Sequence, residues 1–265
     1  MPVAAGRRAI LAAATWFAEN WVGTNRLIFN LVQRTEWRIH GDENLRYEGW
    51  YLVIANHQSW VDIFVLQYLF HRRIPFLKFF IKQELIWFPV LGLTWWVLDF
   101  PFMKRYSKAY LKKHPEKRGE DLKTTRQACE KFKDNPTSVI NFVEGTRLTP
   151  AKHAQQQSPY DHLLKPKAGG TALVLGAMGH MLNSIVDVTI HYPHGSPSFF
   201  WDFLGGRVPE IEVVVQERPI PPHFIGRDYT QDDAFREEIQ AWVRDVWAEK
   251  DAQLAHMKAG STTPH

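Results

Sequence analysis

The sequence predicts an α/β fold, a single domain in which helices flank a central mixed β-sheet, preceded by an N-terminal amphipathic helical segment. Short apolar runs, typical of buried strands, alternate along the chain with longer segments whose apolar residues recur at helical spacing. The chain has 265 residues, 45% of them hydrophobic, and is long enough to fill one large core. We expect the helical segment at residues 1–35, the domain at 36–258 and a disordered tail at 259–265.

The composition limits the class of protein. An aromatic content of 14%, with 11 tryptophans, excludes general disorder. Residues 103–133 carry eleven Lys and Arg against four Asp and Glu, so an anionic partner is expected there. Cys129 is the only cysteine and the histidines are scattered, so we expect neither a disulfide nor a metal site.

Residues 7–32 are expected to form the amphipathic helix. Its apolar side consists of Ile10, Leu11, Ala14, Phe17, Trp21, Leu27, Ile28 and Leu31. The apolar stretch 9–18 is too short to span a bilayer, and Glu19 ends it. The pattern favours a helix that lies in a membrane interface with Arg7 and Arg8 toward the headgroups. An ordinary helix docked on the domain is the alternative.

The first half of the domain begins with two strands around a Gly-Asp-Glu-Asn turn, at 36–40 and 51–55. Helical periodicity follows at 59–70, and a short apolar run predicts a strand at 74–81. Residues 85–98 are uncharged but contain Pro89 and Gly92. They are expected to form a buried core helix or, as we favour, a segment that dips into one leaflet of a membrane.

The second half continues the alternation. Short apolar runs predict strands at 100–105, 138–142, 185–192 and 211–217. Helical periodicity predicts a helix at 119–133, a second that follows the stretch 163–170 and ends near Met181, and a last helix that opens with a capping box from Thr230 to Asp233. The polar stretch 150–161 is expected to be a mobile loop.

Residues 56–62, Asn-His-Gln-Ser-Trp-Val-Asp, place His57 where a buried strand turns into a helix. An α/β sheet presents its chemistry at such turns. Asp62 falls in the first turn of the helix, within reach of the imidazole. A general base needs this pairing, because the carboxylate fixes the tautomer and stabilises the imidazolium. The same residues match a capping box in which Asp62 satisfies a backbone donor at Ser59, and these residues alone do not decide between the two hypotheses.

Other catalytic motifs are absent. The chain contains no Gly-x-Gly-x-x-Gly, no phosphate loop, no His-Glu-x-x-His and no Gly-x-Ser-x-Gly. What remains beside the His-Asp pair is the turn Glu-Gly-Thr-Arg at 144–147, after a buried strand, and Arg105 at the end of another. Because no nucleophile neighbours His57 in the sequence, the set suits a reaction in which a hydroxyl of the substrate is the nucleophile.

Four segments resemble conserved blocks of the 1-acylglycerol-3-phosphate acyltransferases, the PlsC-like glycerolipid acyltransferase family. Residues 56–62 resemble the Asn-His-x4-Asp block, 142–147 the Phe-Pro-Glu-Gly-Thr-Arg block and 102–105 the block between them, and 186–192 take the place of the fourth. Val143 and Asp187 stand where these blocks often have proline. The stretches Pro-Phe-Met-Lys-Arg-Tyr-Ser and Lys-Pro-Lys-Ala-Gly-Gly resemble the branch that contains lysocardiolipin acyltransferases and the bacterial protein YihG.

The resemblance implies transfer of a fatty acyl chain from acyl-CoA or acyl-carrier protein to the sn-2 hydroxyl of 1-acyl-sn-glycerol 3-phosphate, giving phosphatidate, without a cofactor. His57 would be the general base and Asp62 its partner. The residues expected to bind substrate are Lys104, Arg105, Glu144, Gly145, Thr146 and Arg147. The two arginines suit a phosphate because a guanidinium fork fits its oxygens. Glu144 would shape the glycerol pocket or hold Arg147.

Lys165 and Lys167 are candidates for contacts with donor phosphates, and a solvated surface is the alternative for both. The resemblance further implies a monotopic or peripheral protein on the cytoplasmic face of a bacterial inner membrane. Many relatives carry a hydrophobic N-terminal span. Here we expect either that the helix from Arg7 suffices to hold the membrane or that the start is truncated.

Three other functions stay open at this point. The first is an acyltransferase for another lysophospholipid, such as lysophosphatidylglycerol or lysocardiolipin. The second is a non-catalytic protein that binds lipid or nucleic acid through residues 103–133. Nucleic acid is disfavoured because the aromatic residues are not interleaved with the basic ones. The third is a thioester hydrolase.

Overall fold

The computed structural model describes residues 2–41, 43–103, 113–114, 120–133, 135–198 and 200–261. Within them, one sheet has the strand order β1-β8-β7-β2-β6-β3. Its strands are β1 (Glu36–His40), β2 (Tyr51–Ala55), β3 (Leu77–Phe79), β6 (Ser138–Phe142), β7 (Ser184–His191) and β8 (Glu210–Arg218). β8 is antiparallel to β7, whereas the other neighbouring pairs are parallel. The predicted α/β fold with a mixed central sheet is confirmed.

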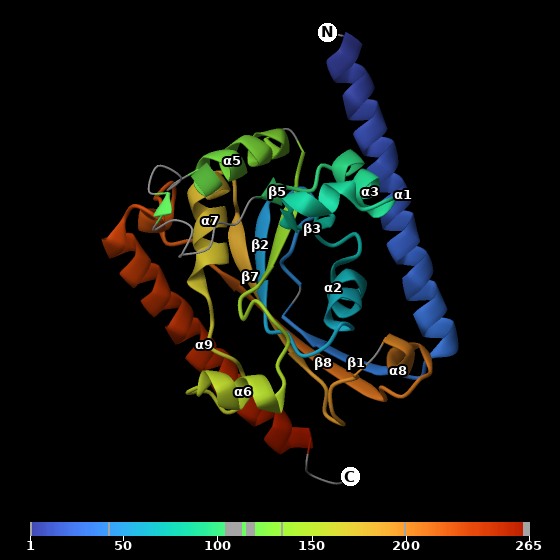
Figure 1. Cartoon of the computed structure of the whole chain (residues 1–265). Coiled ribbons are helices and arrows are strands. Elements are labelled where there is room, and N and C mark those ends of the chain that lie inside the picture. The colour runs from blue at the N-terminus through green and yellow to red at the C-terminus, as the bar shows by residue number, and fades with distance from the viewer. Residues whose placement is uncertain are drawn as a thin grey trace.

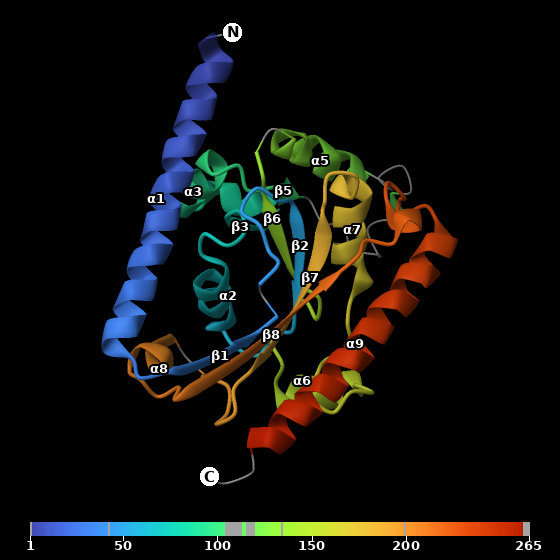
Figure 2. The same ribbon diagram turned by 180° about the vertical axis from the view of Figure 1, so that it is seen from behind.

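Helices cover both faces of this sheet (Figures 1 and 2). They are α1 (Pro2–Val32), α2 (Asp62–Phe70), α3 (Leu91–Val97), α5 (Glu120–Cys129), α6 (Pro150–Gln156), α7 (Ala168–Met178), α8 (Phe200–Leu204) and α9 (Asp233–Ser261). Short 3-10 turns occur at η1 (Gln83–Trp87), η3 (Glu130–Phe132) and η4 (Pro222–Phe224). In both views α5, α7 and α9 lie on one side of the sheet, and α1, α2 and α8 lie on the other.

The central strand β2 is buried along its whole length. Strands that are covered on both faces lose the alternation of polar and apolar residues, which explains the continuous run Tyr-Leu-Val-Ile-Ala. Leu52 and Ile54 face the core formed with α7 and α9, whereas Val53 and Ala55 face the core formed with α2 and with Phe29 of α1. The two cores hold the end of β2 in a fixed place, from which the chain turns to His57.

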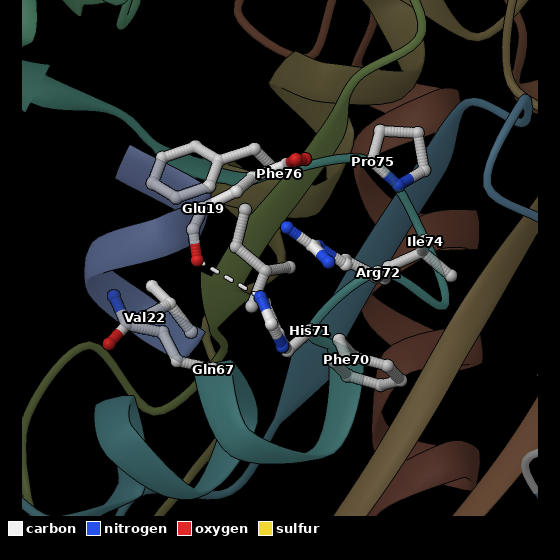
Figure 3. A pocket seen from close by; sticks show the side chains of 10 residues that line it. Glu19, Val22, Gln67, Phe70, His71, Arg72, Ile74, Pro75 and Phe76 are labelled. Atoms are coloured by element: carbon white, nitrogen blue, oxygen red, sulfur yellow. Dashed lines mark hydrogen bonds between the residues drawn. The ribbon is translucent and has the colours of Figure 1, made fainter. Parts of the chain in front are cut away.

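Helix α1 docks against the turn that follows α2 (Figure 3). There the His71 ring approaches the backbone oxygen of Glu19, with Nε2 at 3.0 Å. Gly23 makes this approach possible, because a Cβ at that position would lie only 3.0 Å from Cε1 of His71. A small cavity lined by Val22, Phe70 and Pro75, among others, lies at the same seam. These contacts attach α1 to the domain around Glu19 and Gly23.

The outward side of α1 carries large exposed apolar side chains, as expected for an amphipathic helix. They are Ile10, Trp16, Phe17, Trp21, Leu27, Ile28, Leu31 and Val32. Nη2 of Arg7 lies 2.9 Å from both oxygens of Asp99, which ties α1 to the turn after α3, and the expected contact of Arg7 with headgroups stays a prediction. The side chain of Arg8 lies outside the described part. None of the helices in the described part of the chain is long and apolar enough to cross a bilayer.

Residues 150–156 form helix α6, so the expectation of a mobile loop at 150–161 is wrong there. The side chain of Thr149 accepts the backbone N–H of Lys152, Pro150 occupies the first helical positions, and Gln157 ends the helix in a left-handed conformation. Pro at the start with a Thr cap is a helix signal that the polar composition concealed.

Other boundaries differ less. The strand expected at 74–81 is divided into β3 and β4 (Ile81–Lys82), and β4 pairs with β5 (Phe102–Met103). The cap of α9 is Asp232, whose Oδ1 accepts the Phe235 backbone N–H, and not the expected Thr230. α9 continues to Ser261, beyond the expected end of the domain at 258, and residues 262–265 of the expected tail lie outside the described residues. The domain boundaries themselves stay predictions.

A buried ion pair fastens α9 to β7. Lys250 is fully buried, its Nζ lies 2.6 Å from Oδ1 of Asp187, and it donates to the Val188 carbonyl at 2.7 Å. Arg218 of β8 contacts the other oxygen of Asp187 at 2.9 Å. Burial lowers the pKa of Lys250, and Asp187 opposes that shift. Asp187, at a position where the family often has proline, is thus the counterion of a buried lysine.

We expect Asp187→Ala to lower the free energy of unfolding by about 3–5 kcal/mol, because it leaves the charge of Lys250 buried without a counterion. Urea unfolding of purified protein measures this. Glu36→Ala is the control, since both side chains of the Glu36–Arg38 pair at 2.9 Å are exposed, and its loss should cost less than about 1 kcal/mol. Equal losses in the two variants would contradict this role for Asp187.

Candidate active site

Two of the sequence motifs meet because their strands are parallel neighbours. In the pairing of β2 with β6, Ala55 lies opposite Phe142, so the turns after both strands emerge at the same edge of the sheet. A backbone hydrogen bond of 2.7 Å from Leu148 N–H to the His57 carbonyl joins the two turns. The carboxyl edge of parallel strands is where α/β folds bind ligands.

His57 and Asp62 form the expected pair. Nδ1 of His57 lies 2.8 Å from Oδ2 of Asp62, which is fully buried, while 12% of the histidine side chain is exposed. Because an ionised Asp62 only accepts hydrogen bonds, we assign the proton to Nδ1, which leaves Nε2 free to accept one. The ring also stacks on Phe142, with centroids 4.0 Å apart, so its orientation is fixed from two sides.

The capping hypothesis for Asp62 is correct as well. Oδ2 also accepts the backbone N–H groups of Gln58 at 2.6 Å and Ser59 at 2.8 Å. The other oxygen, Oδ1, accepts the hydroxyl of Tyr192 at 2.6 Å. One carboxylate therefore satisfies the backbone donors of the turn before α2, as the capping hypothesis expected for Ser59, and orients the imidazole. Both hypotheses for the motif therefore hold, because the same carboxylate makes both sets of hydrogen bonds.

A cleft of about 470 Å³ opens beside His57. This size is within the usual range for small-molecule sites. Its apolar wall includes Phe79, Phe80, Ile140, Phe142 and Leu173, and its polar lining includes His57, Asn141, Thr146, Arg147 and Lys167. The combination suits a ligand with one long apolar part and one anionic part.

Arg147 lies in this cleft with its guanidinium over the indole of Trp60, 4.7 Å from the ring centroid. Among the described residues, no carboxylate pairs with Arg147. Stacking on an aromatic face holds the guanidinium plane but leaves its N–H edges available for an anion. The geometry fits the expected phosphate contact.

Thr146 and the Arg147 backbone are held by a lysine that we did not expect. Nζ of Lys152 in α6 donates to Oγ1 of Thr146 at 2.6 Å and to the Arg147 carbonyl at 3.2 Å. Gly145 precedes them with a φ of +70°, a conformation that strongly favours glycine, and a Cβ there would lie 3.3 Å from Nζ of Lys167. The cap at Thr149 was the one signal in the sequence that Lys152 lies in the first turn of a helix next to this site.

Glu144 does not line the cleft and does not hold Arg147, which corrects the expectation. It is fully buried, and its two oxygens accept the backbone N–H groups of His57 at 3.1 Å and Leu164 at 3.0 Å. Burial raises the pKa of Glu144 to about 7, although the two N–H groups act against the shift. Its function here is to join the His57 turn to the segment before α7.

The two candidate donor lysines differ. Lys167 lines the cleft, whereas Lys165 is exposed and is not among the lining residues. Lys104 and Arg105 lie outside the described residues, so their expected contacts stay predictions. No group of three or more His, Cys, Asp or Glu within the described ranges could hold a metal ion.

Two residues besides Lys152 were not foreseen at the site. The Asn56 side chain exchanges hydrogen bonds of 2.9 and 2.8 Å with the backbone of Ile190, which ties the turn after β2 to β7. Tyr192, just after β7, reaches Asp62. Both lie in segments that resemble the blocks of the family, since Asn56 opens 56–62 and Tyr192 ends 186–192, but no sequence pattern indicated what either side chain contacts.

Comparison with known proteins identifies the family. Residues 36–192, more than half of the chain, match the family model described as Acyltransferase, and the chain belongs to this family. It is 24% identical over 247 residues to 1-acyl-sn-glycerol-3-phosphate acyltransferase delta of Homo sapiens, covering 88% of this chain and 58% of the relative. It is 25% identical over 253 residues to the probable 1-acyl-sn-glycerol-3-phosphate acyltransferase 5 of Arabidopsis thaliana, covering 91% and 62%.

The chain thus spans about three fifths of the length of these relatives. Among solved structures, the crystal structure of the 1-acyl-sn-glycerophosphate acyltransferase PlsC from Thermotoga maritima matches with a TM-score of 0.46 and 20% identity, covering 91% of this chain and 81% of that one. The acyltransferase family predicted from the motifs is confirmed. The narrower branch with YihG and the lysocardiolipin acyltransferases stays a prediction.

Glu144→Gln should flatten the pH dependence of stability. Because the folded-state pKa of about 7 lies above the ordinary 4.5, Glu144 contributes most stability below about pH 4.5 and loses that contribution as the pH rises through 7. A glutamine does not titrate, so its free energy of unfolding should fall less between these limits. In acid, the free energy of unfolding of Glu144→Gln should also be about 1–3 kcal/mol below that of wild type, since one backbone N–H loses its acceptor.

Urea unfolding at a series of pH values checks this prediction. Glu238→Gln is the matched control, because Glu238 is half exposed in its pair with Arg227. If Glu144→Gln and wild type gave parallel stability curves, Glu144 would not titrate in this range.

Proposed function

We propose that the protein transfers a fatty acyl chain from an acyl thioester, acyl-CoA or acyl-carrier protein, to the sn-2 hydroxyl of 1-acyl-sn-glycerol 3-phosphate, giving phosphatidate. The observation that carries the proposal is the combination of His57, oriented by buried Asp62, with Arg147 in one cleft that has an apolar wall. Family membership and the names of the relatives support it.

In this proposal His57 acts as the general base. The acceptor phosphate binds Arg147, together with Arg105 as the resemblance implies, which places the sn-2 hydroxyl near Nε2, and Lys167 contacts a phosphate of the donor. Nε2 takes the hydroxyl proton while the oxygen attacks the thioester carbon, and Asp62 stabilises the imidazolium. Collapse of the tetrahedral intermediate breaks the C–S bond, and the leaving sulfur takes the proton from His57. A positioned base of this kind contributes about 10²–10⁴-fold in rate.

The residues around His57 favour direct transfer without an acyl-enzyme. No thiol lines the cleft among the described residues, and the one cysteine, Cys129, is buried in the core beneath α7. Burial raises the pKa of the Cys129 thiol to about 12, so it stays protonated and unreactive. The acceptor's own hydroxyl is therefore the nucleophile in the proposed reaction.

We further propose that one surface of the protein rests on the cytoplasmic face of a bacterial inner membrane, where its acyl donors are available. α3 lies beside α1 in both views (Figures 1 and 2), and α1 exposes the apolar side chains named above. There η1, α3 and the turn between them expose Leu85, Trp87, Phe88, Val90, Leu93 and Trp96. Trp87 is 86% exposed. Tryptophans at the margin of an apolar surface are typical of membrane interfaces.

The acyl-transfer proposal is tested by thiol release from palmitoyl-CoA, with and without lysophosphatidate. We expect release that requires lysophosphatidate, yields phosphatidate and falls about 10²–10⁴-fold in His57→Ala, because the base is lost. Release without an acceptor would indicate a thioester hydrolase. Release only with lysophosphatidylglycerol or lysocardiolipin would change the acceptor. No release with any of these acceptors, from palmitoyl-CoA or from palmitoyl-acyl-carrier protein, would contradict the proposal.

A matched pair of variants controls this assay. Lys167→Met should raise the KM for the acyl donor, since Lys167 lines the cleft, whereas Lys165→Met should leave this KM unchanged. Equal effects of the two would show that the cleft is not where the anionic groups bind.

The membrane proposal predicts co-flotation with vesicles of phosphatidylethanolamine and phosphatidylglycerol. Trp87→Glu combined with Leu93→Glu should lower the bound fraction about tenfold or more, because charges would enter the apolar boundary. Ile225→Glu, which adds a charge to a partly exposed apolar site after η4, should not change it. If the double variant floated as wild type does, α3 would not be part of the surface that contacts the membrane.

A further inference from the structure

We propose that Tyr192 is a positioning residue of the His57–Asp62 pair, and that its hydroxyl, by donating to Asp62, holds that carboxylate and limits the negative charge it presents to the imidazole. As far as reaction rates are concerned, this inference rests on the proposed function. The hydrogen bonds that support the inference are independent of the proposed function.

Tyr192 reaches the site because it directly follows β7, which is a parallel neighbour of β2. β7 runs parallel to β2, with Ala55 opposite Val188, so the end of β7 lies at the same edge as His57. The two hydrogen bonds of Asn56 with the Ile190 backbone lock this edge two residues before Tyr192. Tyr192 is buried, and its ring is part of the core formed with α2.

The oxygens of Asp62 are unequally supplied with donors. Oδ2 receives Nδ1 of His57 and two backbone N–H groups, those of Gln58 and Ser59. Among the described residues, Oδ1 receives only the Tyr192 hydroxyl, at 2.6 Å. A carboxylate can accept about four hydrogen bonds, and a buried oxygen without a donor is costly. Tyr192 therefore completes the shell of Asp62.

The hydroxyl also affects the charge that His57 experiences. Burial, and then the neighbouring Asp62, raise the pKa of Tyr192 well above its ordinary value, so it remains a donor. A donor to Asp62 draws negative charge away from the imidazole. Without it, Asp62 would stabilise the imidazolium more, and the pKa of His57 would rise.

The other charged groups near the imidazole come from different segments. Glu144 accepts the backbone N–H of His57 from the turn after β6, and Arg147 and Lys167 line the same cleft. None of these groups is changed by removing the Tyr192 hydroxyl. A shift in the titration of His57 in such a variant therefore reports the bond to Asp62.

Tyr192→Phe tests the inference with little change of shape. We measure the pKa of His57 by NMR titration of the full chain, identifying its signal by its loss in His57→Gln. We expect an increase of about 0.5–1 unit. The acidic limb of kcat/KM should move to higher pH by the same amount, and kcat should fall about tenfold while KM stays within about twofold.

Tyr160→Phe is the matched control. Tyr160 is also buried and donates a hydrogen bond of 3.2 Å, to the Arg244 carbonyl, but it lies in the core on the other face of the sheet. It should shift neither the pKa of His57 nor the pH profile. The same shift in both tyrosine variants would mean a general structural effect and would overturn the inference.

Two further variants make the test independent of folding and of activity. 3-Fluorotyrosine at position 192 keeps the shape and strengthens the donor, so the pKa of His57 should fall. In an Asp62→Asn background, Tyr192→Phe should no longer shift His57. An unchanged pKa of His57 in both Tyr192 variants would refute the inference. A wild type without acyl transfer would refute the proposed function and leave the titration decisive.

Discussion

The buried carboxylate of Asp62 joins the segments on which the site depends. It belongs to the first turn of α2, and its donors come from the turn after β2 and from the residue after β7. These donors can meet only if β2 and β7 end at the same edge in fixed register. A slip of one residue in that pairing would turn alternate side chains to the opposite face and separate the imidazole from its partner.

Glu144 extends the same constraint to β6. Its carboxyl connects the His57 backbone with Leu164, so the two motif-bearing turns and the segment before α7 form one hydrogen-bonded unit. The residues that face the cleft, such as Arg147 and Lys167, are attached to this unit. The buried polar groups thus provide the rigidity, and the exposed ones remain available to ligands.

The predictable part of the site is the part that is local in sequence. His57 and Asp62 are five residues apart across one strand-to-helix turn, so their pairing follows from local geometry. Glu144 and Arg147 are also close in sequence, which suggested an ion pair. The acceptor role of Glu144 depends on Leu164, twenty residues away, and Tyr192 is 130 residues from Asp62. No local pattern encodes those distances. Likewise, the buried strand β2 was predictable from its composition. Helix α6 was missed because its one sequence signal is the cap at Thr149 with Pro150.

The ion pair between Asp187 and Lys250 has a consequence for the evolution of the family. A chain with proline at the position of Asp187 has no carboxylate there to accompany a lysine at the position of Lys250. Losing either member alone passes through an intermediate with an uncompensated buried charge. The two positions should therefore change together among homologues, and their joint inheritance would mark the lineage to which this chain belongs.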